Sequence, residues 1–224
     1  AVVTISNARI FLGSCASIKV DKTTQNNHNG GKLTISNSLL TSCDVWQGID
    51  VEGDGQTGAF NPKSGMLTII SSQIHDAIEG IFVNNMGYLY GDYCYFENNI
   101  THLHTHGCGE MNGYMNNSTF SYLMVSPSTQ LCNKANMPSG NFPYVLHEYI
   151  SMFKMENDSF ICYDVNGTYT ETAIKIVQIQ TTQWVQNTAY GFYLTDHKIL
   201  GNFVYGVNAA DAHYLHIDGN NNPE

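Results

Sequence analysis

The feature that most constrains this chain is a short phrase that recurs along nearly its whole length. The phrase reads apolar, any residue, apolar, any residue, then Asn or a small residue, and after two more residues another apolar one. Its copies begin 22 to 40 residues apart, at Val3, Leu33, Leu67, Leu89, Gly113, Phe153 and Val177. A repeat of this period indicates a solenoid, a propeller or another array. Because apolar residues alternate, each copy predicts a β-strand, and one unit is too short for a four-stranded propeller blade.

A second phrase, a small residue followed by apolar, any, apolar, comes after most copies of the first. It begins at Ser17, Gly48, Gly80, Ala173, Gly191 and, more loosely, Tyr214. Two such strands, a third strand through residues such as Ile10 and Leu40, and a variable loop make one three-sided coil. We therefore predict an all-β fold, a parallel β-helix of seven to eight coils.

On these phrases, and on segment 43–51, the sequence resembles the right-handed parallel β-helix proteins of the pectin-lyase-like superfamily. In style it is similar to the large secreted β-helix repeat proteins of bacteria. The resemblance covers nearly the whole chain and implies a right-handed solenoid. It also implies a ligand groove along the outer face of the strand that precedes the long loops. The superfamily contains lyases, hydrolases and non-catalytic adhesins, so the fold alone does not settle the function.

In a parallel stack, equivalent strands lie about 4.8 Å apart, so equivalent residues form columns. We expect an inward apolar column at Val3, Leu33, Leu67, Leu89, Phe153 and Val177. Asparagine tolerates tight turns, and we expect it at sharp turns at Asn7, Asn37, Asn117 and Asn157. A small or polar column follows at Ala8, Ser38, Ser72, Cys94, Ser118, Asp158 and Thr182. An aromatic stack is expected at Phe96, Phe120, Phe160 and Trp184.

The charge of the chain limits its partners. It has 224 residues, with 9 Lys and Arg against 19 Asp and Glu, a net charge of −10. This balance argues against nucleic acid and anionic membranes, which require basic residues. It argues less strongly against a polyuronate enzyme, because Arg9 is the single arginine. No apolar run approaches the length of a transmembrane segment.

We expect residues 1–217 to form one β-helix domain and residues 218–224 an Asn-rich tail or linker. Repeat arrays need polar caps, so we expect the sequence to be a piece of a longer protein with further domains. The 42% of hydrophobic residues is enough for a continuous core. Six cysteines in a chain rich in Asn, Gly, Thr and Tyr fit a secreted or cell-surface setting.

Two cysteine pairs are candidates for disulfides between adjacent coils. Cys108 and Cys132 are separated by 24 residues, and Cys15 and Cys43 by 28, close to the local repeat. Equal phase in adjacent coils would bring their Cα atoms within the range that a disulfide tolerates. The alternative is free cysteines that act as small hydrophobic residues.

The outward column of the second phrase is the candidate ligand-binding groove. It comprises Lys19, Asp50, Phe82, His104, Lys175, Tyr193 and His216, with one coil that the pattern does not fix. The loops 21–31, 52–65 and 126–143 would form its walls. Aromatic and charged groups together suit a polysaccharide or another glycan. An ordinary solvated strand face is the alternative.

Two clusters are candidate metal sites. We expect His102, His104 and His106 to point outward on one strand, where residues i and i+2 lie about 6.5–7 Å apart and two imidazoles could share Zn²⁺. Asp50, Glu52 and Asp54 enter a Gly-rich loop, a partial oxygen set for Ca²⁺. The alternatives are solvated or hydrogen-bonded histidines and a polar loop.

Catalytic candidates are few. Lys175 with Tyr193 is the best lyase-like pair, His104 is an isolated base, and Asp50 is the one groove carboxylate with acidic neighbours. No carboxylate pair stands out, as a glycosidase would need. The sequence therefore favours a non-catalytic carbohydrate-binding or adhesive segment. The alternative is a polysaccharide lyase or glycoside hydrolase that acts in the same groove.

Overall fold

The structure is a computed structural model and describes residues 1–25, 28–55, 61–107, 113–123, 143–150, 153–163, 171–179, 192–201, 203–210 and 215–218. These residues form β-strands and their connections, with no helix among them. The strands belong to three parallel sheets, which we name A, B and C.

Sheet A contains eight strands: β1 (Val2–Ser6), β4 (Lys32–Ser36), β7 (Met66–Ile70), β10 (Tyr88–Asp92), β13 (Gly113–Asn116), β16 (Phe153–Glu156), β19 (Phe192–Thr195) and β22 (Leu215–Asp218). Sheet B contains seven: β2 (Arg9–Leu12), β5 (Leu39–Ser42), β8 (Gln73–His75), β11 (Tyr95–Glu97), β14 (Thr119–Leu123), β17 (Ser159–Tyr163) and β20 (Lys198–Gly201). Sheet C also contains seven: β3 (Ser17–Val20), β6 (Trp46–Glu52), β9 (Ala77–Asn84), β12 (Thr101–His106), β15 (Val145–Ile150), β18 (Glu171–Ile179) and β21 (Phe203–Ala210).

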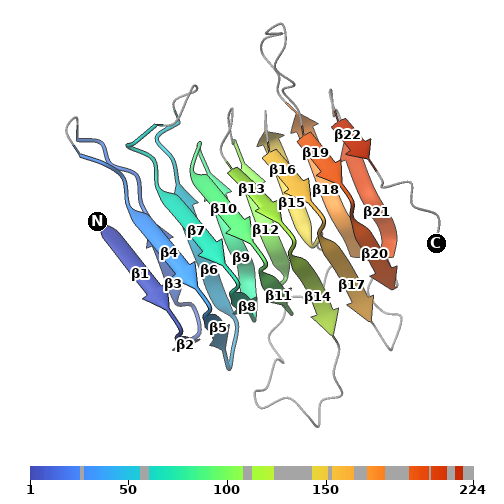
Figure 1. The fold of residues 1–224 in the computed structure, drawn as a ribbon, viewed down its shortest axis with the longest axis horizontal. Helices are drawn as coiled ribbons and strands as arrows, with labels where there is room; N and C mark the ends of the chain where they lie inside the picture. The colour runs from blue at the N-terminus through green and yellow to red at the C-terminus, as the bar shows by residue number, and fades with distance from the viewer. Residues whose placement is uncertain are drawn as a thin grey trace, which may run out of the picture.

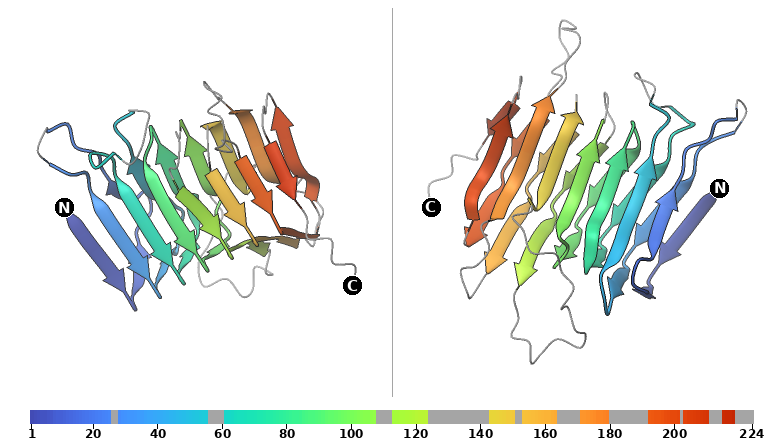
Figure 2. Two further views of the ribbon diagram at one scale, coloured as in Figure 1. Left: turned by 45° about the horizontal axis from the view of Figure 1, so that its top comes forward. Right: turned by 180° about the vertical axis from the view of Figure 1, so that it is seen from behind.

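In each run of three successive strands, one strand joins each sheet, and the chain then begins the next coil. The result is a right-handed parallel β-helix with seven three-stranded coils, and β22 begins an eighth. Figures 1 and 2 show the coils stacked in chain order, with β1 and β22 at opposite ends of the solenoid. The predicted fold is confirmed. The last strand runs through Asp218, one residue past the expected domain end at 217.

The corner between sheets A and B is a two-residue turn in every coil that the structure describes. Its first residue has a positive φ, and at Asn7, Asn37, Asn117 and Asn157 the values are 53°, 47°, 51° and 56°. Asparagine is one of the few side chains that tolerate this left-handed conformation, so the sequence prediction is confirmed. The same conformation occurs without asparagine at Ser71, Tyr93 and Asp196. The coil geometry therefore imposes the conformation, and asparagine only lowers its cost.

The second residue of that turn closes the corner with a hydrogen bond to the coil before it. The hydroxyl of Ser38 accepts the N–H of Ala8 at 3.1 Å, and the hydroxyl of Ser72 accepts the N–H of Ser38 at 3.2 Å. Further along, the hydroxyl of Ser118 accepts the N–H of Cys94 at 3.1 Å. The small or polar column thus satisfies buried backbone N–H groups that face no strand partner.

The last members of this column are ionisable. Oδ1 of Asp158 accepts the N–H of Ser118 at 2.7 Å, and Nδ1 of His197 accepts the N–H of Asp158 at 3.2 Å. His197 stands where Thr182 was expected, and Thr182 lies outside the described residues.

The apolar columns fill the interior as the phrases predicted from the second to the sixth coil. Leu33, Leu67, Leu89 and Phe153 are buried in sheet A, whereas Val3 is 51% exposed because β1 has a neighbour on one side only. In sheet B, the ring centroids of Phe96, Phe120 and Phe160 repeat at 5.0 Å with planes 13° apart. The next residue of this stack is Ile199. Trp184, the expected fourth ring, lies outside the described residues.

Val177 is a correction to the predicted inward column. It lies in β18 of sheet C, where it pairs with Glu148 and Ala210, and not in sheet A. The sheet A position is held by Phe192, which pairs with Phe153. The cause is that inner faces of all three sheets alternate apolar residues in the same way. The phrase alone cannot say which sheet a strand joins once a coil departs from the usual length.

We predict that Phe120→Ala lowers the free energy of unfolding by about 3–5 kcal/mol, because a fully buried ring between two others leaves a cavity. Urea denaturation of purified variants measures the loss. The control is Phe11→Ala in the same sheet, where the ring is 71% exposed and the expected change is within about 0.5 kcal/mol. Equal losses in the two variants would contradict the stacked core.

From the buried carboxyl group of Asp158 we predict that the free energy of unfolding depends on pH. Burial, together with the charges of Asp92 and Glu156, raises the pKa of this fully buried carboxyl from 3.8 to about 8. The native state then retains a proton that the unfolded state releases, so stability is full below about pH 4 and falls as pH rises through about 8. Asp158→Asn removes this loss. Its stability relative to wild type should rise between pH 5 and pH 9 by on the order of 2 kcal/mol or more.

Denaturation curves at several pH values measure this difference. Parallel pH profiles for the two proteins would show that Asp158 titrates normally in the native state.

Candidate functional site

The outer face of sheet C carries a continuous central column of side chains. Strand pairing aligns one residue from each coil: Lys19, Asp50, Phe82, His104, Leu146, Lys175 and Asn208. The first four residues are neighbours as the sequence predicted. Leu146 occupies the coil that the pattern left open, and Lys175 follows it.

Tyr193 and His216 do not belong to this column, and their assignment to it is wrong. They lie in β19 and β22 of sheet A, where Tyr193 pairs with Lys154 on one side and with His216 on the other. Their segments match the second phrase, but that phrase also fits a sheet A strand. Lys175 has Leu146 and Asn208 as its strand neighbours, so the lyase-like pair of Lys175 with Tyr193 is not formed by adjacent coils.

His104 is the centre of the best-defined polar cluster on this face. Its Nδ1 lies 2.7 Å from Oε1 of Glu79, and its Nε2 lies 3.1 Å from Oε2 of Glu148. Its ring centroid lies 4.7 Å from that of Phe82 in the preceding coil. The imidazole is therefore fixed by three groups, Glu79 and Phe82 from the preceding coil and Glu148 from the following one. His104 is not the isolated base that the sequence indicated.

The two glutamates were missed by the sequence analysis. Glu79 precedes Gly80, and the second phrase begins only at that glycine, so its side chain was assigned to no column. Glu148 lies in the coil that no copy of the phrase marks. Recognising Val145, Leu146 and His147 as a degenerate copy would have aligned Glu148 with His106, as the strand pairing does.

The charges around His104 favour its protonated form. Burial opposes the charge, but the hydrogen bonds and negative charges of Glu79 and Glu148 outweigh burial and raise its pKa above 6.5. Burial also raises the pKa of Asp50, with Lys19 opposing and nearby carboxylates adding to the rise. The face therefore combines several carboxylates with His104 and three lysines, Lys19, Lys22 and Lys175.

His102 points into the core, which corrects the expectation that three histidines face outward. It is fully buried, with Nδ1 3.1 Å from Nδ2 of Asn99 and its ring centroid 4.7 Å from that of Tyr144. Burial, with a smaller effect of His75, lowers its pKa to about 3. The N–H groups of His102 and Leu103 both donate to the carbonyl of Tyr144, at 2.8 and 3.2 Å. This irregularity breaks the alternation of the strand and turns His102 inward.

His104 and His106 do face outward, with ring centroids 6.5 Å apart. Each is held by other groups, however: His104 by the two glutamates, and Nδ1 of His106 by Oδ1 of Asn84 at 3.2 Å. In the part of the chain that the structure describes, no three His, Cys, Asp or Glu side chains are grouped to hold a metal ion. The expected Zn²⁺ site at His102, His104 and His106 is not assembled.

The carboxylates proposed for Ca²⁺ have separate partners. Oδ2 of Asp50 lies 3.8 Å from Nζ of Lys19, and Oε1 of Glu52 lies 2.8 Å from Nζ of Lys22. Oδ1 of Asp54 accepts a hydrogen bond from Asn61 at 2.6 Å. The three side chains do not converge on one point in this structure.

The loops beside sheet C are joined to one another where the structure describes them. The N–H of Thr23 donates to the carbonyl of Lys63 at 2.9 Å, and the N–H of Gly30 donates to that of Pro62 at 2.8 Å. These bonds link the expected walls 21–31 and 52–65. Most of the third expected wall, 126–143, lies outside the described residues.

Cys15 and Cys43 are exposed, free thiols, so the candidate disulfide between them is not formed. The N–H of Cys15 donates to the carbonyl of Val45, which shows that Cys15 is level with residue 45 and out of register with Cys43. Cys94 and Cys162 are buried and form no disulfide, and burial raises the pKa of Cys94 to about 11. Cys108 and Cys132 lie outside the described residues.

Comparison with known proteins gives no family for this chain. No protein-family model matches it, and no curated protein matches it. A search of the described residues for a helix long and apolar enough to cross a membrane found none.

We predict that NMR titration of the imidazole gives His104 a pKa above 6.5, and that Glu79→Gln or Glu148→Gln lowers it because each removes a charge and a strong acceptor. The stability that this histidine supplies is present at low pH and lost as pH rises through its raised pKa. Glu97→Gln in sheet B is the charge-matched control. If it lowered the His104 pKa as much as Glu79→Gln, the local contacts would not be the cause.

Proposed function

We propose that this chain is a non-catalytic carbohydrate-binding or adhesive segment of a secreted or cell-surface protein, and that a glycan binds along the outer face of sheet C. The observation that carries the proposal is the ring pair of Phe82 and His104, at 4.7 Å, in a column that also contains Lys19, Asp50 and Lys175. Aromatic rings stack on sugar faces, and charged groups orient hydroxyls.

The regular spacing of the column supports a polymeric ligand. Aligned side-chain positions recur about every 4.8 Å across the sheet, so an extended chain of sugar units would contact several residues of the column. The resemblance of the repeats to the pectin-lyase-like superfamily supports an extracellular setting, as does the composition.

The charge around the ring pair of Phe82 and His104 favours neutral or amine-bearing glycans. Glu79 and Glu148 both contact His104. Lys19 and Lys22 are paired with Asp50 and Glu52, and Lys175 lies two coils from His104 in the same column. A polyuronate would bring further negative charge to this surface, with an electrostatic cost. A glycan with amino groups would gain from the same carboxylates.

A polysaccharide lyase or glycoside hydrolase is the second candidate, and the contacts of His104 favour it. Proton transfer to and from a reacting sugar requires an acid and a base within hydrogen-bond reach of the bond that breaks. Glu79 and Glu148 flank one imidazole, so a single short cluster could hold and deliver protons. Asp50 lies two coils from His104 in the same column.

We predict that Phe82→Ala weakens the binding of an oligosaccharide of glucose or glucosamine by about fivefold, or about 1 kcal/mol, through lost stacking. Calorimetric titration measures the affinity, with oligogalacturonate as the acidic comparison and expected to bind more weakly. Tyr114→Ala is the matched control. That ring lies on the outer face of sheet A, 5.5 Å from Tyr90.

Two results would refute the proposal. One is the absence of binding by any of the three oligosaccharides. The other is a loss of affinity in Tyr114→Ala with none in Phe82→Ala, which would assign the ligand to sheet A.

The enzyme candidate makes a different prediction. If the chain is catalytic, Glu79→Gln, Glu148→Gln or His104→Gln should each reduce turnover roughly 10²-fold or more, as expected when a general acid or base is removed. Product is measured as new reducing ends or as ultraviolet absorbance of unsaturated sugars. The non-catalytic proposal expects no product from the wild-type chain, and reproducible release that these variants abolish would overturn it.

A further inference from the structure

A second surface feature lies at the corner between sheets A and B, on the first three coils. It is a cavity of about 450 Å³, lined by Asn7, Ala8, Arg9, Asn37, Ser38, Leu39, Ser71 and Gln73. None of these residues is acidic, although the chain as a whole has a net charge of −10. The cavity also contains the single arginine of the sequence.

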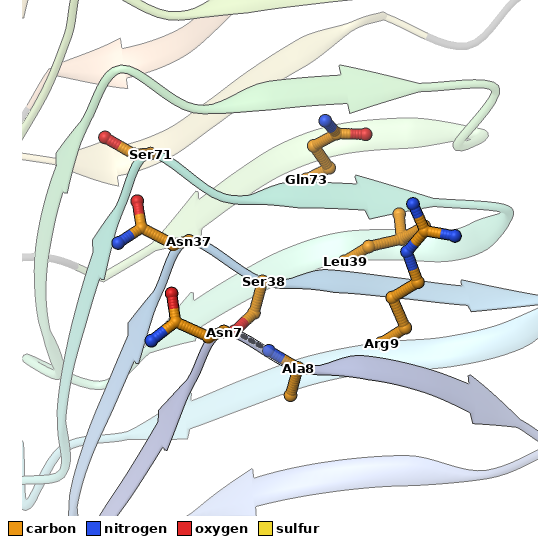
Figure 3. Close-up of a pocket in the computed structure, with 8 residues that line it drawn as sticks. All are labelled: Asn7, Ala8, Arg9, Asn37, Ser38, Leu39, Ser71 and Gln73. Atoms are coloured by element: carbon orange, nitrogen blue, oxygen red, sulfur yellow. Dashed lines mark hydrogen bonds between the residues drawn. The ribbon is translucent and has the colours of Figure 1, made fainter.

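Two rows of residues form the walls of this cavity. Asn7, Asn37 and Ser71 are the left-handed turn residues of three successive coils. Arg9 and Gln73 stand on either side of Leu39 in one column of sheet B. Figure 3 shows the amides of Asn7 and Asn37 extending parallel to each other, while the guanidinium of Arg9 extends along the column in the direction of Gln73.

The polar groups of the two walls are available to a ligand. Across the described residues, the side chains of Asn7, Arg9, Asn37 and Gln73 make no hydrogen bond or ion pair within the protein. The equivalent asparagines of later coils differ. Nδ2 of Asn157 donates to Oδ1 of Asn117 at 2.8 Å, and Nδ2 of Asn117 donates to Oδ1 of Asp92 at 2.8 Å. The same column is thus closed by internal bonds in later coils and open in the first two.

The chemistry of the walls defines the ligand class. A guanidinium binds a carboxylate through two parallel hydrogen bonds. Side-chain amides both donate and accept, which matches hydroxyl groups. We infer that this corner binds a small hydroxy acid, such as an aldonic acid, with its carboxylate on Arg9 and its hydroxyls on the amides of Asn7, Asn37 and Gln73. This site is separate from the face of sheet C, so either proposal can fail without the other.

Gluconate is the probe, and sorbitol and acetate are its matched comparisons. Sorbitol has the hydroxyl groups without the carboxylate, and acetate has a carboxylate without the hydroxyl groups. We expect saturable gluconate binding, at least tenfold tighter than that of either comparison, by calorimetric or NMR titration. Arg9→Gln should weaken gluconate binding at least tenfold. Asn37→Asp should do the same, because aspartate tolerates the left-handed turn but repels an anion.

Lys198→Gln is the control, since Lys198 is an exposed cation in the same column of sheet B, at the far end of the solenoid. It should leave gluconate affinity unchanged, and thermal unfolding should show that all three variants are folded. The inference is overturned if wild type shows no saturable gluconate binding, or if sorbitol binds as tightly as gluconate. It is also overturned if Lys198→Gln loses as much affinity as Arg9→Gln.

Discussion

The in-register pairing of each strand with the equivalent strands of neighbouring coils determines most of this structure. Backbone hydrogen bonds run along the solenoid axis, so a residue meets its counterpart from the next coil at a separation of about 4.8 Å. Any residue type that repeats at one position must therefore pack or bond with its own kind. The stack of Phe96, Phe120 and Phe160 is one result of this constraint, and the hydrogen bond from the N–H of Ser38 to the hydroxyl of Ser72 is another.

The same constraint explains how much of the fold could be predicted from the sequence. Where coils are regular, equivalent residues are visible as a period, and the columns through Leu33, Asn37 and Phe96 followed directly. The period does not show which sheet a strand joins, however, because the inner faces of all three sheets alternate apolar residues in the same way. The spacing between successive repeats changes after residue 160. The sequence therefore assigns Val177 and Tyr193 to the wrong sheets.

The candidate site could be predicted only in part, for related reasons. Phe82 and His104 lie in adjacent regular strands, so their alignment followed from the repeat. The partners of His104 depend on irregular positions that a period cannot show. Glu79 precedes the strand phrase, and Glu148 belongs to a coil whose phrase is degenerate. His102 was misplaced because two successive N–H groups share one carbonyl, a detail of hydrogen bonding with no sequence signature.

The two-residue turn between sheets A and B has a consequence for how such a chain can change in evolution. Every described coil keeps this connection at two residues, whereas the connection from sheet C to the next sheet A strand varies in length and includes the segments 21–31 and 53–65. Connections of different length leave the register of the next coil intact, because strand pairing sets it: Lys32 pairs with Val2 on one side and with Met66 on the other. Surface loops beside sheet C can therefore diversify independently of the core, and recognition can change while the scaffold remains constant.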